Sequence, residues 1–484
     1  MIWRKRLAFL AAGPTLASLL AASPAGSSPV LAAGTSRPAE RPLATPILSA
    51  RRLPAWVDDT LAGQRLAKQL GAVTAGRLGG AKGPPGCVEV AQGARTVWSL
   101  DPTAELIPAS NLKVVTATAV LSTLGADDRL TTTVAAPAPA RAGTLTGNLY
   151  LVGGGDPYLM TAAFNSRLYY PEPVYTSLDR LAAAVRVAGI TTVTGSVVGD
   201  ASRYDSLVGV PGWAPQYLAE GDVGPLSALE VDDGAQPVDP GTPSRPAGTR
   251  PPAADPALFA AQAFTYALRA QGVRVTGPPA TGRTPAGSVT VTSAQSAPLG
   301  AEVEQLLRVS DDTAAELLTK ELGFKASGHG TTAAGTAVIS RDVAADGLPV
   351  AQLVARDGSG LDREDRATCA LITATLQRAG TTGPVATGLP VAGRTGTLRD
   401  RMAGTVAVGR LHAKTGTLDG VSALSGYIDP KPGAPTPELA QPVYFSIIIN
   451  GMDSDLAAPL ADRIGVTVAA YPDAVPLAQL EPRS

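Results

Sequence analysis

One serine and one lysine in the sequence have a spacing that suits nucleophilic catalysis. Of the eight lysines of the chain, only Lys113 has a serine three residues before it, and that serine is Ser110. In a helix, residues three apart share a face, so the Lys113 amine would lie beside the Ser110 hydroxyl group. A neutral amine can take the proton of a serine hydroxyl and so activate it. The pair predicts an acyl-accepting serine, although a helix-capping serine followed by a solvated lysine would have the same spacing.

A second group of reactive side chains is Lys414-Thr415-Gly416-Thr417, which contains the single K-[ST]-G triplet of the chain. We expect it at the end of a strand. Gly416 lets the backbone approach a ligand closely, Lys414 offers a cation, and the two threonines offer hydroxyl groups. This set suits a substrate carboxylate. The N–H group of Thr417 would complete an oxyanion hole with that of Ser110.

A third group, Ser310-Asp311-Asp312, precedes a helical pattern over residues 313–322. Ser310 could supply a bridging hydroxyl group between the other two groups. The same residues would also make an ordinary helix cap, because serine and aspartate are favoured there and acidic side chains suit the first turn.

These three groups, in this order, resemble the S-x-x-K, S-D-N and K-T-G motifs of β-lactamases and penicillin-binding proteins. Ser110 and Ser310 are 200 residues apart, which is too far for a compact β-lactamase. The chain resembles the D-alanyl-D-alanine carboxypeptidase/endopeptidase family, the class C low-molecular-mass penicillin-binding proteins, in which extra domains separate the first two motifs. The likeness runs from about residue 50 to about residue 470. It includes residues 151–157, 223–229, 357–361 and 396–399.

The resemblance implies an α+β fold, with an antiparallel sheet flanked by helices and a strand-rich insertion. It also implies cleavage of peptidoglycan stem peptides through an acyl-enzyme on Ser110, and covalent inhibition by β-lactams. Lys113 would take the proton of Ser110, and Ser310 would relay a proton to the leaving amine. The terminal carboxylate would be bound by the residues of the K-T-G motif, Lys414, Thr415, Gly416 and Thr417.

Asp312 departs from the motif of the resembled family, which has asparagine at this position. An asparagine amide donates a hydrogen bond, whereas an ionised aspartate only accepts. Asp312 would still hold Lys113 or Lys414, and a tight contact would keep Lys113 protonated. We therefore expect reduced or altered activity, and an impaired wall sensor or binding protein is the main alternative function.

Two charged residues are candidates for reading a charged diamino acid in a stem peptide. Arg363 follows the segment 357–361 and could meet its carboxylate, and Asp200 could meet its ammonium group. Both residues would equally suit an ordinary solvated surface.

Other hydrolase classes find less support. A Ser-His-Asp triad would need one of the two histidines, His329 and His412, and no G-x-S-x-G segment occurs. A metallopeptidase would need more ligands and an H-E-x-x-H segment, which is absent. A β-lactamase or esterase on the same scaffold fits poorly with the long insertion.

The elements that must position these residues follow from periodicity. We expect helices over residues 52–72, from 110 onward, and over 301–307, 313–322 and 456–464. Strands are expected over 87–91, 96–100, 409–414, 421–429 and 443–450. Residues 49–129 and 297–484 would form a transpeptidase-like domain, and residues 130–296 one or two inserted strand-rich domains.

The N-terminus has the pattern of an export signal. Arg4, Lys5 and Arg6 precede an apolar stretch and then small residues, so residues 1–33 are expected to be a signal peptide and 34–48 a linker. The protein would then work in the periplasmic or cell-wall space or be secreted, with membrane contact only through an uncleaved signal. Cys87 and Cys369 could form a disulfide or stay as two thiols.

Composition excludes some partners. Forty basic and 41 acidic residues nearly cancel, so no net field favours nucleic acid. An apolar fraction of 45% is too high for a disordered chain. The motifs imply no metal or organic cofactor.

Overall fold

The structure is a computed structural model that describes residues 55–79, 83–166, 168, 174–234, 252–431 and 440–472. The predicted signal peptide, residues 1–33, and linker, residues 34–48, lie outside the described residues. Within the described part, no helix has both the length and the apolar character required to cross a membrane.

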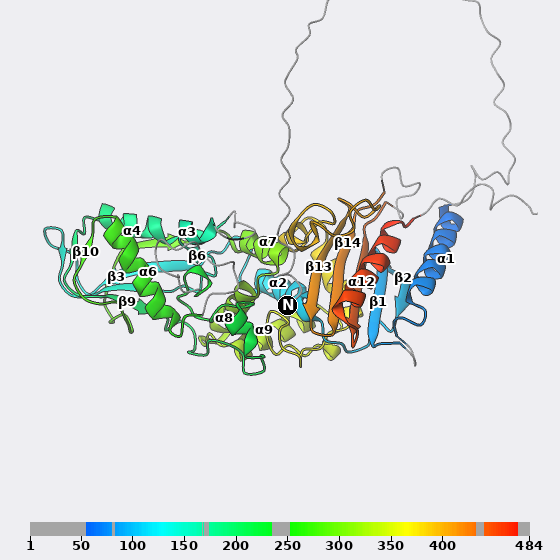
Figure 1. The fold of residues 1–484 in the computed structure, drawn as a ribbon, viewed down its shortest axis with the longest axis horizontal. Coiled ribbons are helices and arrows are strands. Elements are labelled where there is room, and N and C mark those ends of the chain that lie inside the picture. The colour runs from blue at the N-terminus through cyan, green and yellow to red at the C-terminus, as the bar shows by residue number, and fades with distance from the viewer. Residues whose placement is uncertain are drawn as a thin grey trace, which may run out of the picture. The chain divides into compact units, whose positions relative to one another are not determined.

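A five-stranded antiparallel sheet carries the K-[ST]-G motif at one edge (Figure 1). Its strand order is β13-β14-β15-β1-β2, so the first strands of the chain join the last ones through the pairing of β1 with β15. Strand β14 is buried along its whole length, which requires cover on both faces of the sheet. The strands are β1 (Gly86–Gln92), β2 (Arg95–Leu100), β13 (Leu411–Leu418), β14 (Val421–Ile428) and β15 (Val443–Asn450).

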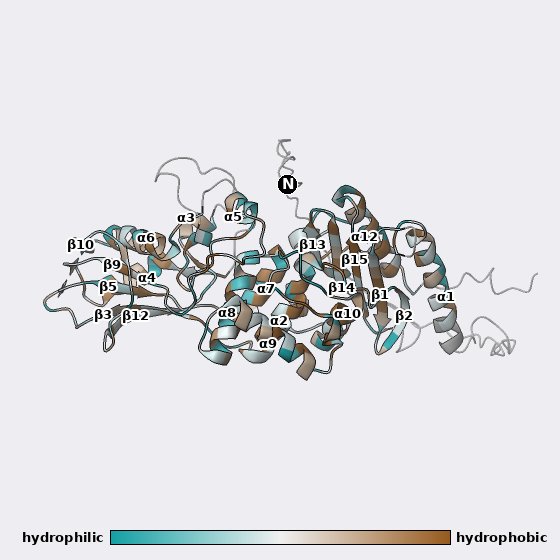
Figure 2. Cartoon of the chain, turned by 90° about the horizontal axis from the view of Figure 1, so that it is seen from below, coloured by the Kyte–Doolittle hydropathy of each residue, from teal (hydrophilic) through white to brown (hydrophobic). Residues whose placement is uncertain are grey.

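Helices supply that cover. On one face, Ile447 and Ile449 of β15 share a core with α1 (Ala55–Thr74) and α12 (Ser454–Ala469). The side chain between them, Ile448, points to the other face because side chains alternate along a strand. There it packs with Cys369 at the start of α10 (Cys369–Ala379). The apolar colour of β14, β15 and β1 in Figure 2 marks this buried layer.

Helix α2 (Leu112–Thr123) is the centre of a helical cluster beside the sheet. Its residues Val114, Val115, Ala117 and Val120 are all buried, and a helix that is apolar on every side must be surrounded by other elements. The helices around it are α7 (Leu299–Val309), α8 (Asp312–Ser327), α9 (Thr332–Ala345), α10 and α11 (Pro384–Gly388). Short 3-10 segments are η3 (Ala109–Asn111), η5 (Val350–Gln352) and η6 (Gly396–Leu398).

The region between α2 and α7 forms a second sheet, of order β11-β9-β5-β3-β12. Its core joins Val134 of β3 to Phe264 of α6 and Leu181 of α4, so helices contribute as much as strands. Small sheets β10-β8-β4 and β6-β7 adjoin it. The elements are β3 (Thr131–Ala136), β4 (Thr144–Leu145), β5 (Leu149–Val152), β6 (Leu159–Met160), α3 (Ala162–Asn165), β7 (Thr176–Ser177), α4 (Leu178–Val187), β8 (Thr192–Val193), β9 (Val197–Asp200), α5 (Gln216–Glu220), η4 (Asp232–Gly234), α6 (Pro256–Ala270), β10 (Arg274–Val275), β11 (Ala280–Thr281) and β12 (Val289–Gln295).

One stretch of this region, residues 201–234, packs back onto the motif-bearing part of the chain. Trp213 and Leu226 share an apolar cluster with Ala109, Leu317 and Leu418. Ala109 directly precedes Ser110, and Leu418 directly follows Thr417. This stretch therefore forms one wall beside two of the three motifs.

Several element boundaries differ from the sequence-based expectation. Lys414-Thr415-Gly416-Thr417 lies at the end of a strand as expected, but that strand, β13, spans Leu411–Leu418 and so runs further than the expected 409–414. The β-branched threonines pair with β14 and carry the strand onward. Helices α9, α10, α4 and α6 were not predicted from the sequence.

Cys87 and Cys369 form a disulfide that joins β1 to the first residue of α10. Their Cα atoms are 5.9 Å apart, and both residues are fully buried. Of the two alternatives that the sequence left open, a disulfide or two free thiols, the structure has the disulfide.

Candidate active site

Ser110 lies on a tight turn that leads into α2. The turn is the 3-10 segment η3, and Ala109 within it has a positive φ of 48°. Two glycines allow the backbone to pack closely here. A Cβ atom at Gly360, whose φ is +86°, would lie 2.0 Å from the Ala109 carbonyl oxygen, and one at Gly416 would lie 3.1 Å from the Ser110 nitrogen. Gly416 thereby brings strand β13 against the serine.

Lys113 connects the S-x-x-K motif to Ser310-Asp311-Asp312. Its side chain is fully buried, and Nζ donates to Ser110 Oγ at 3.0 Å and to Asp312 Oδ1 at 2.5 Å. A third bond, of 2.8 Å, goes to the backbone carbonyl group of Ser359. Three acceptors around one buried amine fix its position relative to the serine hydroxyl group.

Asp312 is the first residue of α8, and Asp311, not Ser310, caps that helix by accepting from the Ala314 N–H group. Burial raises the pKa of Asp312, while the neighbouring Lys113 and Lys414 cations oppose the rise. The carboxyl group contacts Lys113 and not Lys414 among the hydrogen bonds of the described residues.

Lys414 connects the K-T-G motif, to which it belongs, to Ser310-Asp311-Asp312. Its Nζ donates to Ser310 Oγ at 2.7 Å and to the Thr415 carbonyl oxygen at 2.8 Å. Burial, reinforced by the positive charge of Lys113, holds the pKa of Lys414 well below its ordinary value, and Asp312 counteracts this in part. Ser310 has a left-handed backbone with φ of 64°, which places it in the turn between α7 and α8.

Two further polar side chains hold strand β13 in place. Thr415 Oγ1 and Thr397 Oγ1 are 2.8 Å apart, so the hydroxyl group of Thr415 is engaged by η6. The Asn111 amide donates to the Lys414 carbonyl oxygen at 3.0 Å and accepts from the Leu424 N–H group at 3.3 Å. Asn111 was missed in the sequence because a residue inside S-x-x-K has no signal of its own.

The loop Asp357–Leu361 also lies at the site, since its Ser359 carbonyl group contacts Lys113. Asp357 Oδ2 accepts from the Trp213 indole at 2.8 Å, which ties the loop to the 201–234 stretch. The sequence identified this loop only through the family resemblance.

The two residues considered for reading a charged substrate lie apart from this network. Arg363 is exposed and donates to the Asp419 carbonyl oxygen at 2.9 Å, just after β13. Asp200 is buried in β9, where its carboxylate accepts from the Ser202 and Thr284 N–H groups. One N–H group on each oxygen fixes the orientation of this carboxylate, and the hypothesis that Asp200 meets a substrate ammonium group stays a prediction.

Neither histidine contacts Ser110 through any hydrogen bond of the described residues. His412 stacks on Tyr427 with ring centroids 4.6 Å apart, and its Nε2 lies 3.0 Å from Asp429 Oδ2. His329 is exposed in the loop after α8. The geometry gives the serine a lysine partner and leaves the triad alternative without support.

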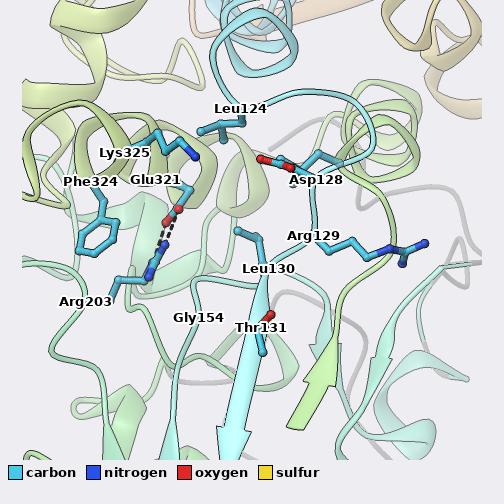
Figure 3. A pocket seen from close by; sticks show the side chains of 11 residues that line it. Leu124, Asp128, Arg129, Leu130, Thr131, Gly154, Arg203, Glu321, Phe324 and Lys325 are labelled. Carbon is cyan, nitrogen blue, oxygen red and sulfur yellow. Dashed lines mark hydrogen bonds and ion pairs between the residues drawn. The ribbon is translucent and has the colours of Figure 1, made fainter.

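A separate cavity of about 440 Å³ lies at the far end of α8 (Figure 3). Arg203 and Glu321 face each other in it through two hydrogen bonds of 2.8 and 2.6 Å, and Phe324 lies beside them. None of the motif residues lines this cavity.

A serine whose hydroxyl group touches a buried lysine three residues on, with a second serine–lysine contact beside it, can accept an acyl group. On an antiparallel sheet flanked by helices, this set defines the class of penicillin-binding and β-lactamase-like serine enzymes.

Comparison with known proteins identifies the family. The sequence model of the D-Ala-D-Ala carboxypeptidase 3 (S13) family matches residues 66–253 and 241–470. The chain belongs to this family of serine-type enzymes, which confirms the resemblance seen in the motifs. It is 33% identical over 447 residues to the D-alanyl-D-alanine carboxypeptidase of Actinomadura sp. (strain R39), covering 78% of this chain and 79% of that protein. It is 31% identical over 350 residues to carboxypeptidase DacB of Mycolicibacterium smegmatis, covering 70% and 71%.

Solved structures show the same fold. Penicillin-binding protein 4 (dacB) from Haemophilus influenzae superposes with a TM-score of 0.66 at 20% identity, covering 83% of this chain and 97% of that one. The expected α+β fold is thereby confirmed. The same protein has also been solved in complex with a β-lactam, and that structure superposes with a TM-score of 0.60 at 19% identity, covering 83% and 97%.

Proposed function

We propose that this protein is a serine-type D-alanyl-D-alanine carboxypeptidase that cleaves peptidoglycan stem peptides through an acyl-enzyme on Ser110. The observation that carries the proposal is the position of Lys113, whose Nζ contacts both Ser110 Oγ and Asp312 Oδ1. The relative from Actinomadura is named a D-alanyl-D-alanine carboxypeptidase and the relative from Mycolicibacterium a carboxypeptidase, and both names support the proposal.

In the proposed acylation, Lys113 takes the proton of Ser110, and Ser110 Oγ bonds to the carbonyl carbon between two D-alanines. The N–H groups of Ser110 and Thr417 hold the oxyanion. The carbon–nitrogen bond then breaks, and the proton that Lys113 took from Ser110 reaches the leaving amine through the Ser310 hydroxyl group, which gives one proton and regains one. Water hydrolyses the ester and restores the serine. Lys414, Thr415 and Thr417 bind the terminal carboxylate, with Gly416 giving close access to β13, and Arg363 is proposed to contact the stem peptide further out.

β-Lactams are proposed to acylate Ser110 as covalent inhibitors. We also propose that residues 1–33 direct export to the cell-wall or periplasmic space, where the substrate lies, and that residues 130–296 form the inserted domains of the family. The match to a β-lactam complex of a related fold supports the first of these proposals.

The test is to incubate the purified protein with a labelled penicillin, map the adduct, and assay D-alanine release from a stem peptide. We expect labelling at Ser110 and release of D-alanine. Ser110→Ala should abolish both, whereas Ser288→Ala, which removes a half-buried hydroxyl group from the second sheet region, should change neither. An adduct on another residue would contradict the proposal.

The second candidate function is a wall-binding or sensing protein without turnover. The 2.5 Å contact between Lys113 and Asp312 favours it, because an ionised carboxylate stabilises the protonated amine. Labelling at Ser110 without release of D-alanine would support this alternative. Endopeptidase activity would appear as cleavage of a cross-linked dimer supplied in place of the stem peptide.

A further inference from the structure

Glu316 is a buried carboxyl group beside the site that the proposed mechanism does not use. It lies one helical turn after Asp312 on α8 and is fully buried. Its Oε1 atom accepts two hydrogen bonds from successive N–H groups, Gly358 at 2.9 Å and Ser359 at 2.7 Å. The same peptide segment presents the Ser359 carbonyl oxygen to Lys113 Nζ.

The segment held by Glu316 has little room to move. A Cβ atom at Gly358 would lie 1.9 Å from Thr319 Oγ1 of α8, so the loop lies directly on that helix. Thr116 of α2 donates to the Gly358 carbonyl oxygen at 2.7 Å, and Asp357 Oδ1 accepts from the Gly360 N–H group at 2.7 Å. Glu316 supplies the bonds from α8, and Thr116 supplies the bond from α2.

We propose that Glu316 is a positioning residue, which holds the Ser359 carbonyl group against Lys113 and so fixes the amine beside the Ser110 hydroxyl group. This inference rests on the proposed function of Ser110 and Lys113. Without Glu316, two buried N–H groups lose their acceptor, and the loop must shift to find another. A displaced Ser359 carbonyl group would let the Lys113 amine turn away from the serine.

The charge on Glu316 matters as well as its position. Burial, with the neighbouring carboxyl group of Asp357, raises the pKa of Glu316 to about 8, although hydrogen bonds from Ser359 and Gly358 oppose the rise. The groups facing it are Asp357 in the loop and, beyond the Ser359 peptide, Lys113 of α2 and Asp312 of α8. Ionisation of Glu316 would add a negative charge that favours protonated Lys113, so acylation should slow as the pH rises through about 8.

The experiment measures the rate of Ser110 acylation by a labelled penicillin, and kcat and KM for a stem peptide, across pH in the full-length protein. Glu316→Gln keeps an amide oxygen for both N–H groups and should acylate within about threefold of the parent, without the slowing near pH 8. Glu316→Ala should lower the acylation rate and kcat by about tenfold to a hundredfold, with KM changed much less. Glu302→Gln, which removes an equally buried carboxyl group from α7, should behave as the parent.

The inference is overturned if Glu316→Ala, folded by circular dichroism, acylates as fast as the parent. It is also overturned if Glu316→Gln keeps the alkaline slowing, a readout that remains usable if the alanine variant does not fold. If the parent itself is not acylated at Ser110, the proposed function fails first, and the two failures are thereby distinguished.

Discussion

The Asp312 carboxyl group and the Lys113 amine form the shortest contact of the site, at 2.5 Å. An asparagine at this position would leave Lys113 without a negatively charged partner. The amine would then lose its proton more readily and accept the proton of Ser110 more easily. The substitution of one oxygen by a nitrogen is therefore expected to control the rate of acylation.

Asp312→Asn should raise the rate of penicillin acylation by about tenfold or more at neutral pH. Because burial raises the pKa of Asp312, the parent carboxyl group takes up a proton at higher pH than an exposed aspartate would, and the difference between variant and parent should shrink as the pH falls. The measurement is the second-order acylation rate constant across pH, with Asp127→Asn at an exposed position as the control. An unchanged or slower rate in Asp312→Asn would refute the role assigned to this carboxylate.

Lys414 leads to a prediction about substrate binding. Its pKa is held well below the ordinary value, so it loses its charge at lower pH than an exposed lysine would. KM for a peptide with a free terminal carboxylate should therefore rise with pH, at lower pH than an exposed lysine would produce. A matched ester substrate without that carboxylate should show a flat KM. Equal pH dependence for both substrates would argue against carboxylate binding by Lys414.

At the scale of elements, the nucleophile turn depends on close contact with the loop Asp357–Leu361. Gly360→Ala would force a Cβ atom to within 2.0 Å of the Ala109 carbonyl oxygen and strain a left-handed backbone. Gly328 has a similar φ, +74°, but no atom would lie within 4 Å of a Cβ atom at this position. Gly328→Ala should therefore cost only the strain of the left-handed backbone, about 1–2 kcal/mol. The Gly360 variant should have the lower melting temperature and slower acylation. Equal effects of the two substitutions would show that the turn tolerates displacement.

Local patterns predicted the motif-bearing elements better than the contacts between them. The S-x-x-K spacing and the apolar periodicity were enough to expect a helix after Ser110, and the short apolar stretches 421–429 and 443–450 were enough for strands. Helix α10 was missed, and the ties made by Asn111 and Glu316 were missed too. Those ties join residues that are distant in sequence, and no spacing rule encodes them.

The role considered for Asp200, binding of a substrate ammonium group, shows the same limit of prediction from sequence. Asp200 was considered as a ligand for an ammonium group because it is acidic and lies in the inserted region. How a carboxylate is oriented depends on which backbone amides fold against it, and here those of Ser202 and Thr284 do. Such contacts are visible only in the folded chain.

The whole molecule buries several carboxyl groups whose pKa values are raised. Burial raises the pKa of Asp156 to about 6, of Glu316 to about 8 and of Asp365 to about 10, with nearby Asp357 adding to the last two. In the folded state these groups keep protons that the unfolded chain releases at lower pH. Their contribution to the free energy of unfolding is therefore largest at acidic pH and is lost as the pH rises through these values.

The melting temperature should accordingly fall as the pH rises from about 5.5 to about 8.5, although the lowered pKa of Lys414 acts in the opposite direction. Asp365→Asn and Glu316→Gln should each flatten this slope, and Asp127→Asn should not. The measurement is thermal unfolding followed by circular dichroism at matched ionic strength. A melting temperature that stays level or rises across this range would contradict the assignment of protonated buried carboxyl groups.

The bond between Cys87 and Cys369 closes a covalent ring that contains Ser110, Ser310 and the whole second sheet region, while Lys414 lies outside it. A protease that cuts once anywhere inside the ring opens it without dividing the polypeptide. A nicked molecule would therefore still run as one species on a non-reducing gel and would separate into two fragments only after reduction. The bond keeps the catalytic groups within one covalent unit even after damage to the exposed loops between them.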